Sequence, residues 1–173
     1  VEPRAGTVHP AKLATGLRTL ALCRGVTVHE GTPVLAVESG QPCTLRCPGG
    51  RVRAAKVVLA TNAWASAIPE LRRYMYVVES QIVATEPVGA TLDRIGWTGG
   101  ESITDSQLLV DYYRTTRDGR IAFGKGTGAL SWGSAIDGRF SEDADSIALT
   151  RADLLATYPM LDQGAISHGW SGP

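Results

Sequence analysis

The first part of the chain carries apolar residues at helical spacing. Between residues 9 and 25 they recur every three or four positions, which predicts a helix. Pro10 suits the first helical turn, where its missing N–H would have no partner in any case, and Gly25 suits the end of a helix. The apolar stripe that we expect to face a core consists of Leu13, Leu17, Leu20 and Ala21.

Apolar and polar residues then alternate, which predicts short strands. A strand is expected over residues 26–30, and a small antiparallel meander with glycine-rich turns follows it. The strands of the meander are expected over residues 32–39, 43–48 and 51–55. Residues 56–61 are a continuous apolar run, typical of a strand covered on both faces. Residues 62–73 predict a short helix with a break at Pro69.

The second half of the chain predicts strands followed by one helix. One long strand or two are expected over residues 74–88. Further strands are expected over residues 107–116, 120–126 and 164–170, the first two joined by a turn at Arg117–Gly119. A helix within residues 141–161 ends before Pro159. Its apolar face consists of Ile147, Leu154, Leu155 and Tyr158.

This order of elements predicts an α+β protein. Residues 1–74 are interpreted as part of a nucleotide-binding α/β domain that includes the meander. Residues 75–173 are interpreted as a substrate domain built on a mainly antiparallel sheet, whose last few residues return toward the first domain. A chain of 173 residues is long enough for one domain or two small ones.

Charge and cysteine content exclude several classes of protein. Seventeen basic residues balance seventeen acidic ones, which argues against binding nucleic acid through bulk charge. No apolar run approaches the roughly 20 residues that span a bilayer, so we expect no membrane partner. Three cysteines, Cys23, Cys43 and Cys47, make no disulfide framework, and a cytoplasmic location fits them best. Cys43 and Cys47 are interpreted as small apolar residues on adjacent strands, and no metal site is expected.

The stretch GRIAFGKGTG, residues 119–128, contains most of a phosphate-binding P-loop. A P-loop requires Ser or Thr after its lysine to hold Mg²⁺, and a helix must follow. Gly126 follows Lys125 here, and the preceding residues look like a strand. We therefore interpret the stretch as a strand ending at glycines where a backbone closely approaches a neighbouring strand or a flat ligand.

Four segments in order carry a resemblance to a known family. They are TVHPAKLATGLRTLALCRGVTVHEGTPVLAVE, GGRVRAAKVVLATNAWAS, YYRTTRDGRIAFGKG and ISHGWSGP. Together they resemble the D-amino-acid oxidase-like FAD-dependent oxidoreductases, in particular the glycine/sarcosine oxidase and gamma-glutamylputrescine oxidase group. The resemblance implies oxidation of a small amine or amino acid, with hydride passing to FAD. It also implies a central fragment of the enzyme, because the strand–G-x-G-x-x-G–helix unit that binds the FAD pyrophosphate is absent from this sequence.

The resemblance assigns expected roles to particular positions. Contacts with FAD are implied for Pro33, Val34, Ala60, Thr61, Asn62, Trp64, Gly124, Gly126, Trp170, Ser171 and Gly172. A sheet facing the substrate is implied for Tyr112, Tyr113 and Arg114. No catalytic acid or base is assigned, because the flavin performs the chemistry while the protein positions the amine. Many relatives have glycine where Asn62 stands.

The residues themselves leave structural alternatives open. Asn62 is also a candidate cap for the turn that follows it, and Trp64 and Trp170 are also candidates for a core. Alternation along a strand sends Tyr112 and Tyr113 to opposite faces, so at most one of them lines a pocket.

Two charged or titratable side chains have alternative roles as well. Arg114 shares a face with Tyr112, where it either binds a substrate carboxylate or forms an ion pair with Asp111 or Asp118. His168 either approaches the pocket or has a structural role.

A second class of function also stays open. The chain is alternatively a non-catalytic α+β binding or interaction module with the same fold. Without the pyrophosphate-binding unit, we expect the isolated 173 residues to bind FAD weakly or not at all and to be inactive. Self-association through an apolar surface that the absent segments would cover is expected.

Overall fold

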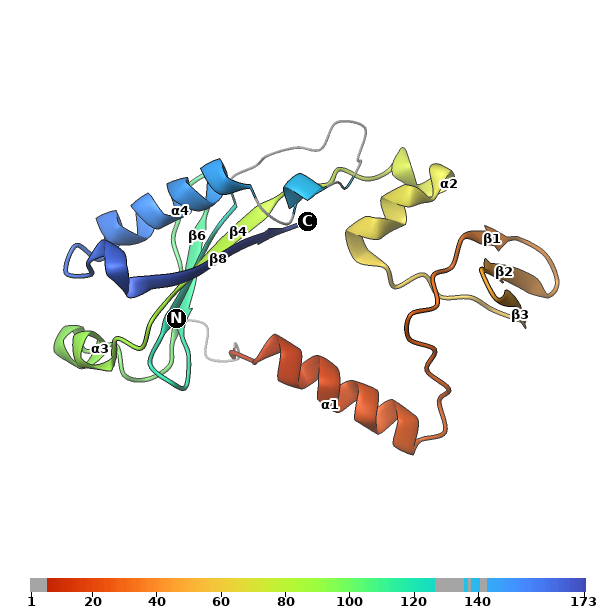
Figure 1. The fold of residues 1–173 in the computed structure, drawn as a ribbon, viewed down its shortest axis with the longest axis horizontal. Helices are drawn as coiled ribbons and strands as arrows, with labels where there is room; N and C mark the ends of the chain where they lie inside the picture. Colours follow the sequence, from red (N-terminus) through yellow and green to blue (C-terminus); the bar gives the residue numbers. More distant parts are fainter. Residues whose placement is uncertain (1–5, 127–135, 137, 141–142) are drawn as a thin grey trace. The chain divides into compact units, whose positions relative to one another are not determined.

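The computed structural model describes residues 6–126, 136, 138–140 and 143–173. The chain divides into two compact units, one comprising Val8–Ala60 and the other formed mainly by Thr61–Pro173 (Figure 1). Each unit is described by itself. The predicted boundary between cofactor and substrate domains after residue 74 stays a prediction.

The unit Val8–Ala60 begins with helix α1 (Pro10–Cys23), which confirms the predicted helix. Pro10 occupies the first turn, and Gly25 has the left-handed φ of 81° that suits the helix end. The expectation that the apolar stripe faces a core is wrong within this unit, where Leu17 is 56% exposed and α1 has no buried residue. Helical spacing shows which face of a helix is apolar, but it supplies no element to cover that face.

The predicted meander is confirmed as a three-stranded antiparallel sheet. Its strands, in the order β1-β2-β3, are β1 (Ala36–Glu38), β2 (Cys43–Cys47) and β3 (Gly50–Ala54). Cys43 and Cys47 lie at the two ends of β2, so their predicted placement on adjacent strands is wrong. Among the described residues, no group of three His, Cys, Asp or Glu side chains is arranged to hold a metal ion.

Two predicted strands of this unit are wrong. Residues 26–30 and 56–61 form no strand, and Val58 is 87% exposed. An apolar run forms a buried strand only when neighbouring strands satisfy its backbone hydrogen bonds. Here β1, β2 and β3 pair with one another, and neither segment joins their sheet.

The unit Thr61–Pro173 is built on a five-stranded sheet in which every pairing is antiparallel. Its strands, in the order β5-β6-β7-β4-β8, are β4 (Ser80–Thr85), β5 (Ser102–Thr104), β6 (Asp111–Thr115), β7 (Ile121–Lys125) and β8 (Ile166–Gly172). The predicted mainly antiparallel sheet is therefore confirmed, although β4 and β6 are shorter than expected. The turn at residues 117–119 is confirmed, with Gly119 at a φ of 79°.

Several helical segments accompany this sheet, including two short 3₁₀ helices at Gly138–Phe140 and Gln163–Ala165. A 3₁₀ helix (Asn62–Ala67) is followed by α2 (Pro69–Arg72), and Pro69 opens α2, which confirms the predicted break. Helix α3 (Gly89–Ile95) and strand β5 were not predicted, because each is too short to show a period. Helix α4 (Ala144–Thr157) matches the predicted helix and lies along the sheet (Figure 1).

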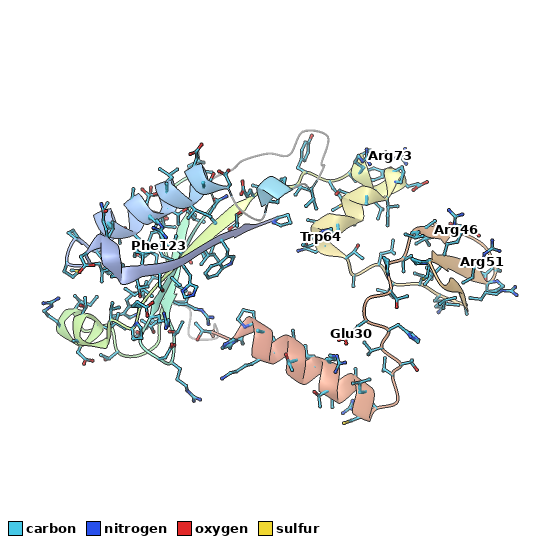
Figure 2. All side chains as sticks on the ribbon, viewed as in Figure 1. Glu30, Arg46, Arg51, Trp64, Arg73 and Phe123 are labelled. Atoms are coloured by element: carbon cyan, nitrogen blue, oxygen red, sulfur yellow. The ribbon has the colours of Figure 1, made fainter. Side chains whose placement is uncertain are left out.

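The core lies between the sheet and α4. Phe123, Val83 and Leu154 are completely buried there, and Figure 2 shows Phe123 among the strands beneath α4. Ile147, Leu155 and Tyr158 pack against this core, so the predicted apolar face of α4 is confirmed. In the described ranges of the chain, no helix is both long and apolar enough to cross a membrane.

Candidate functional site

The sheet has one face against α4 and an opposite face, called here the outer face. Tyr113 belongs to the α4 side, where its ring stacks on Phe123 with centroids 5.0 Å apart. Tyr112 and Arg114 flank Tyr113 on β6 and therefore belong to the outer face. The prediction that the two tyrosines point to opposite faces is thus confirmed, whereas the prediction that at most one of them lines a pocket is wrong, because both border the small hollow described below. The outer face comprises Ser80, Ile82, Ala84, Ser102, Thr104, Tyr112, Arg114, Ala122, Gly124, His168, Trp170 and Gly172.

The ring of Tyr112 lies across the backbone of Gly124. The two residues are directly opposite each other on β6 and β7. A Cβ on Gly124 would overlap the ring carbons and lie 2.8 Å from the Tyr112 hydroxyl oxygen. The hydroxyl group reaches across β7 to a hydrogen bond with Ser80 Oγ on β4. The predicted close approach is therefore made at Gly124 by the side chain of a neighbouring strand, whereas a Cβ on Gly126 would meet nothing within 4 Å.

Arg114 lies beside a small hollow on the outer face. The hollow has a volume of about 100 Å³ and is lined by Ile82, Ser102, Tyr112, Tyr113, Arg114, Ala122 and Gly124. Arg114 has an interaction partner of its own, and Asp111 and Asp118, the two carboxylates considered for it, each contact another cation. Asp111 lies 3.0 Å from Lys125 Nζ, and Asp118 lies 2.9 Å from Arg120 Nε. The guanidinium of Arg114 can form several N–H donor bonds at once, so it can bind a carboxylate at this hollow.

Lys125 forms ion pairs within the fold, which agrees with the interpretation that residues 119–128 are not a P-loop. Its Nζ lies 2.7 Å from Asp153 Oδ2 on α4 and 3.0 Å from Asp111 Oδ1 on β6. The hydrogen bond with Asp153 is the largest cause of the raised pKa of Lys125, followed by an opposing effect of burial. Residues 121–125 form strand β7. Lys125 therefore joins α4 to the sheet.

Strand β8 places its residues on both faces. A Cβ on Gly169 would lie 2.6 Å from Ile147 Cγ2, which shows that Gly169 faces α4. His168 and Trp170, on either side of it, therefore face outward, and Trp170 is 43% exposed. Ser171 belongs to the α4 side, where its Oγ accepts a 3.4 Å hydrogen bond from the Asp143 N–H.

The predicted cofactor contacts at the start of this unit are accessible. Trp64 is 57% exposed and is drawn on the 3₁₀ helix in Figure 2, so it is not a core residue of its unit. Thr61 and Asn62 are exposed as well. Asn62 has a φ of 47°, and no side-chain cap closes this helix. Asparagine and glycine both tolerate this left-handed backbone.

The remaining predicted contacts are also at the surface of their units. Pro33, Val34 and Ala60 belong to Val8–Ala60, and all three are exposed. At Gly126 and Gly172 a Cβ would meet nothing within 4 Å, so both lie beside open space. Contact of these residues with FAD stays a prediction.

Sequence reasoning did not single out several residues of the outer face: Ser80, Ile82, Ala84, Ser102, Thr104 and Ala122. Alternation along residues 80–85 could have placed Ser80 and Ala84 on one face. The pairing register of the strands places Ser80 near Tyr112 and Ala122 beside Ala84. This register could not be predicted from the sequence, because it depends on strands that are far apart in the chain.

Comparisons with known proteins agree with this architecture. A family profile described as "FAD dependent oxidoreductase" matches residues 1–173 of this chain. The probable oxidoreductase OrdL of Haemophilus influenzae is 30% identical over 178 residues, covering 99% of this chain and 38% of that protein. Gamma-glutamylputrescine oxidoreductase of Escherichia coli is 29% identical, covering 96% of this chain and 38% of that protein. The chain thus spans less than two fifths of the length of these relatives.

Solved structures share the fold. Glycine oxidase from Geobacillus kaustophilus has a TM-score of 0.69 at 19% identity, covering 92% of this chain and 40% of the other. L-Proline dehydrogenase from P. horikoshii has a TM-score of 0.71 at 20% identity, covering 94% and 42%. Because the family profile matches along the whole chain, this α+β protein belongs to the family of FAD-dependent oxidoreductases.

Proposed function

We propose that the whole protein oxidises an amine or amino acid and that the outer face of the sheet is directed toward the substrate. The family is that of FAD-dependent oxidoreductases, and the similar proteins include ones named for gamma-glutamylputrescine, glycine and L-proline. When bound, FAD supplies the acceptor for a hydride from the carbon that bears the amine. The amine carbon is thereby oxidised to an imine.

The observation that carries the proposal is the position of Arg114 beside Tyr112 at the hollow. Both side chains point away from the core, and neither is needed to hold α4 on the sheet. A guanidinium can bind a carboxylate through two parallel hydrogen bonds, which fixes the orientation of an amino acid. Ser80 fixes the Tyr112 hydroxyl group through its hydrogen bond. These residues bind and orient a substrate, and no acid–base pair is required of them.

The residues predicted to contact FAD fit a flat ring system. Trp170 is partly exposed on the outer face, and Gly126 and Gly172 lie beside open space. A flat apolar ring can approach such residues closely because no Cβ blocks it. In the other unit, Pro33 and Val34 offer exposed apolar surface for the adenine side.

The test is a visible absorption spectrum of the whole protein before and after addition of small secondary amines and amino acids. We expect a flavin spectrum that bleaches with at least one of them. Arg114→Met should raise KM for a carboxylate-bearing substrate at least about tenfold, because a charge-assisted hydrogen bond contributes roughly 1.5–3 kcal/mol. Arg117→Met is the matched control, since Arg117 is exposed in the turn after the same strand. Equal effects of the two substitutions would contradict the role of Arg114.

The alternative is a non-catalytic binding module with the same fold. A colourless whole protein would support this alternative against the oxidase. For the isolated chain we expect no oxidase activity under either reading, and turnover with added FAD would refute that expectation.

A further inference from the structure

A row of four residues crosses the outer face beside the hollow. Arg114 on β6 is directly opposite Ala122 on β7, Ala122 is opposite Ala84 on β4, and Ala84 is opposite His168 on β8. We call these four residues the alanine row. Two cationic or titratable side chains therefore stand at its ends, with two methyl side chains between them.

Taller side chains border the alanine row on both sides. The neighbouring row contains Tyr112, Ile82 and Trp170, with Gly124 lying under the Tyr112 ring. On the other side, Arg120 Nη1 lies 3.3 Å from Glu86 Oε2 and donates to Ser167 Oγ at 3.4 Å. The middle of the alanine row therefore carries only methyl side chains, and larger side chains lie on either side of it.

The length of the row follows from the strand spacing. Three intervals of about 4.8 Å separate β6 from β8, so the Cα atoms of Arg114 and His168 are roughly 14 Å apart. A substrate as small as glycine cannot contact both ends across this span. An elongated substrate can, because alanine methyl groups leave the space above them open to a methylene chain.

The ends of the row have complementary chemistry. Arg114 offers several N–H donors to a carboxylate. At the other end, Ser167 Oγ lies 2.8 Å from His168 Nδ1 and fixes that side of the ring. The Nε2 atom of this exposed ring can donate or accept a hydrogen bond according to the tautomer.

We propose that the alanine row makes the protein selective for an elongated amine that carries a carboxylate. The carboxylate binds Arg114, the methylene chain lies over Ala122 and Ala84, and a hydrogen-bonding group at the far end meets His168. This inference rests on the proposed function of the outer face. It assigns the choice of substrate length to Ala84 and Ala122.

The test uses the whole flavin-loaded protein and ω-hydroxy carboxylates of increasing chain length. These probes carry the carboxylate and a hydrogen-bonding end but no amine to be oxidised. Isothermal titration calorimetry should show affinity rising about twofold to fourfold with each methylene until the hydroxyl group reaches His168. Ala84→Leu should abolish this rise and leave the shortest probe unchanged. His168→Ala should make the hydroxylated and plain carboxylates of the longest series bind equally.

Two further variants keep the test decisive. Ala122→Val adds bulk to the middle of the alanine row from β7 with a residue suited to strands. It should also abolish the rise of affinity with chain length. Ala148→Leu adds the same bulk at an exposed position of α4, and it should leave the rise intact. An affinity that does not depend on chain length in the unsubstituted protein overturns the inference. So does an equal loss of affinity for short and long probes in Ala84→Leu.

A parallel measurement separates this inference from the proposed function. Flavin reduction is followed with short and long amines that carry a carboxylate. Reduction by amines without any length preference overturns the role of the alanine row and leaves the oxidase intact. Absence of reduction by every amine overturns the proposed function itself.

Discussion

The contact between Tyr112 and Gly124 predicts that Gly124→Ala has opposite effects on the free energy of unfolding with and without the Tyr112 ring. Gly124 is buried in β7, and its φ lies outside the left-handed region, so Gly124→Ala creates no backbone strain of its own. The new methyl group must, however, displace the Tyr112 ring. Displacement removes the hydrogen bond to Ser80, which is worth about 1 kcal/mol, and part of the ring's packing.

A loss of entropy in the unfolded chain opposes this destabilisation, and the two effects together give the expected change in unfolding free energy. Replacing glycine by alanine in a compatible strand position stabilises the folded state by about 0.4–1 kcal/mol through the unfolded chain. Gly124→Ala should therefore destabilise the protein by roughly 0–2 kcal/mol while Tyr112 is present. With Tyr112→Ala in the background, the clash is gone, and the same substitution should stabilise by about 0.4–1 kcal/mol.

A double-mutant cycle measures this change of sign. Urea unfolding of the four proteins gives the coupling free energy, provided that the m-values agree. We expect a coupling of at least about 1 kcal/mol between the two positions. If Gly124→Ala costs the same in both backgrounds, the ring does not require the glycine, and the geometry argued for the outer face is incorrect.

Three further predictions concern other parts of the chain. Asp143 caps α4, and hydrogen bonds led by the one from the Ser146 hydroxyl lower its pKa. Asp143→Ala should cost about 1 kcal/mol of unfolding free energy at pH 7, and this cost should fade as the pH falls below the ordinary Asp value of about 3.9 and the carboxylate is protonated in both states. Burial raises the pKa of Tyr158 to about 12, so unfolding releases its proton above pH 10; Tyr158→Phe should reduce the loss of stability between about pH 10 and 12 in alkaline urea titrations. Leu17 is more than half exposed on α1, so Leu17→Glu should reduce self-association of the chain in sedimentation velocity. An unsubstituted chain that is monomeric would contradict self-association through this apolar surface.

Local features of the sequence predicted the elements whose stability is local. Pro10 and Gly25 bracket α1, and Gly119 forms the turn between β6 and β7, because their backbone preferences act within a few residues. The same reasoning failed at residues 56–61, where an apolar run forms no strand. A strand depends on hydrogen bonds to neighbours, and the identity of those neighbours is not contained in the run itself.

The candidate site was predictable in composition but not in arrangement. The resemblance pointed to Tyr112, Arg114 and Gly124, and alternation placed the first two on one face. It could not show that Gly124 serves Tyr112, or that Ser80 completes the contact from β4. Both facts depend on the register across three strands, which is set by side-chain packing on the other face.

That dependence explains why core and site are joined within β6. Tyr113 stacks on Phe123 and meets the rings of Trp97 and Tyr158, so its packing fixes the position of the strand against α4. A strand held in this way cannot slip by one residue without exchanging its two faces. The aromatic cluster beneath the sheet therefore sets the register that directs Tyr112 outward, and the outer face gains its order from contacts that it does not itself make.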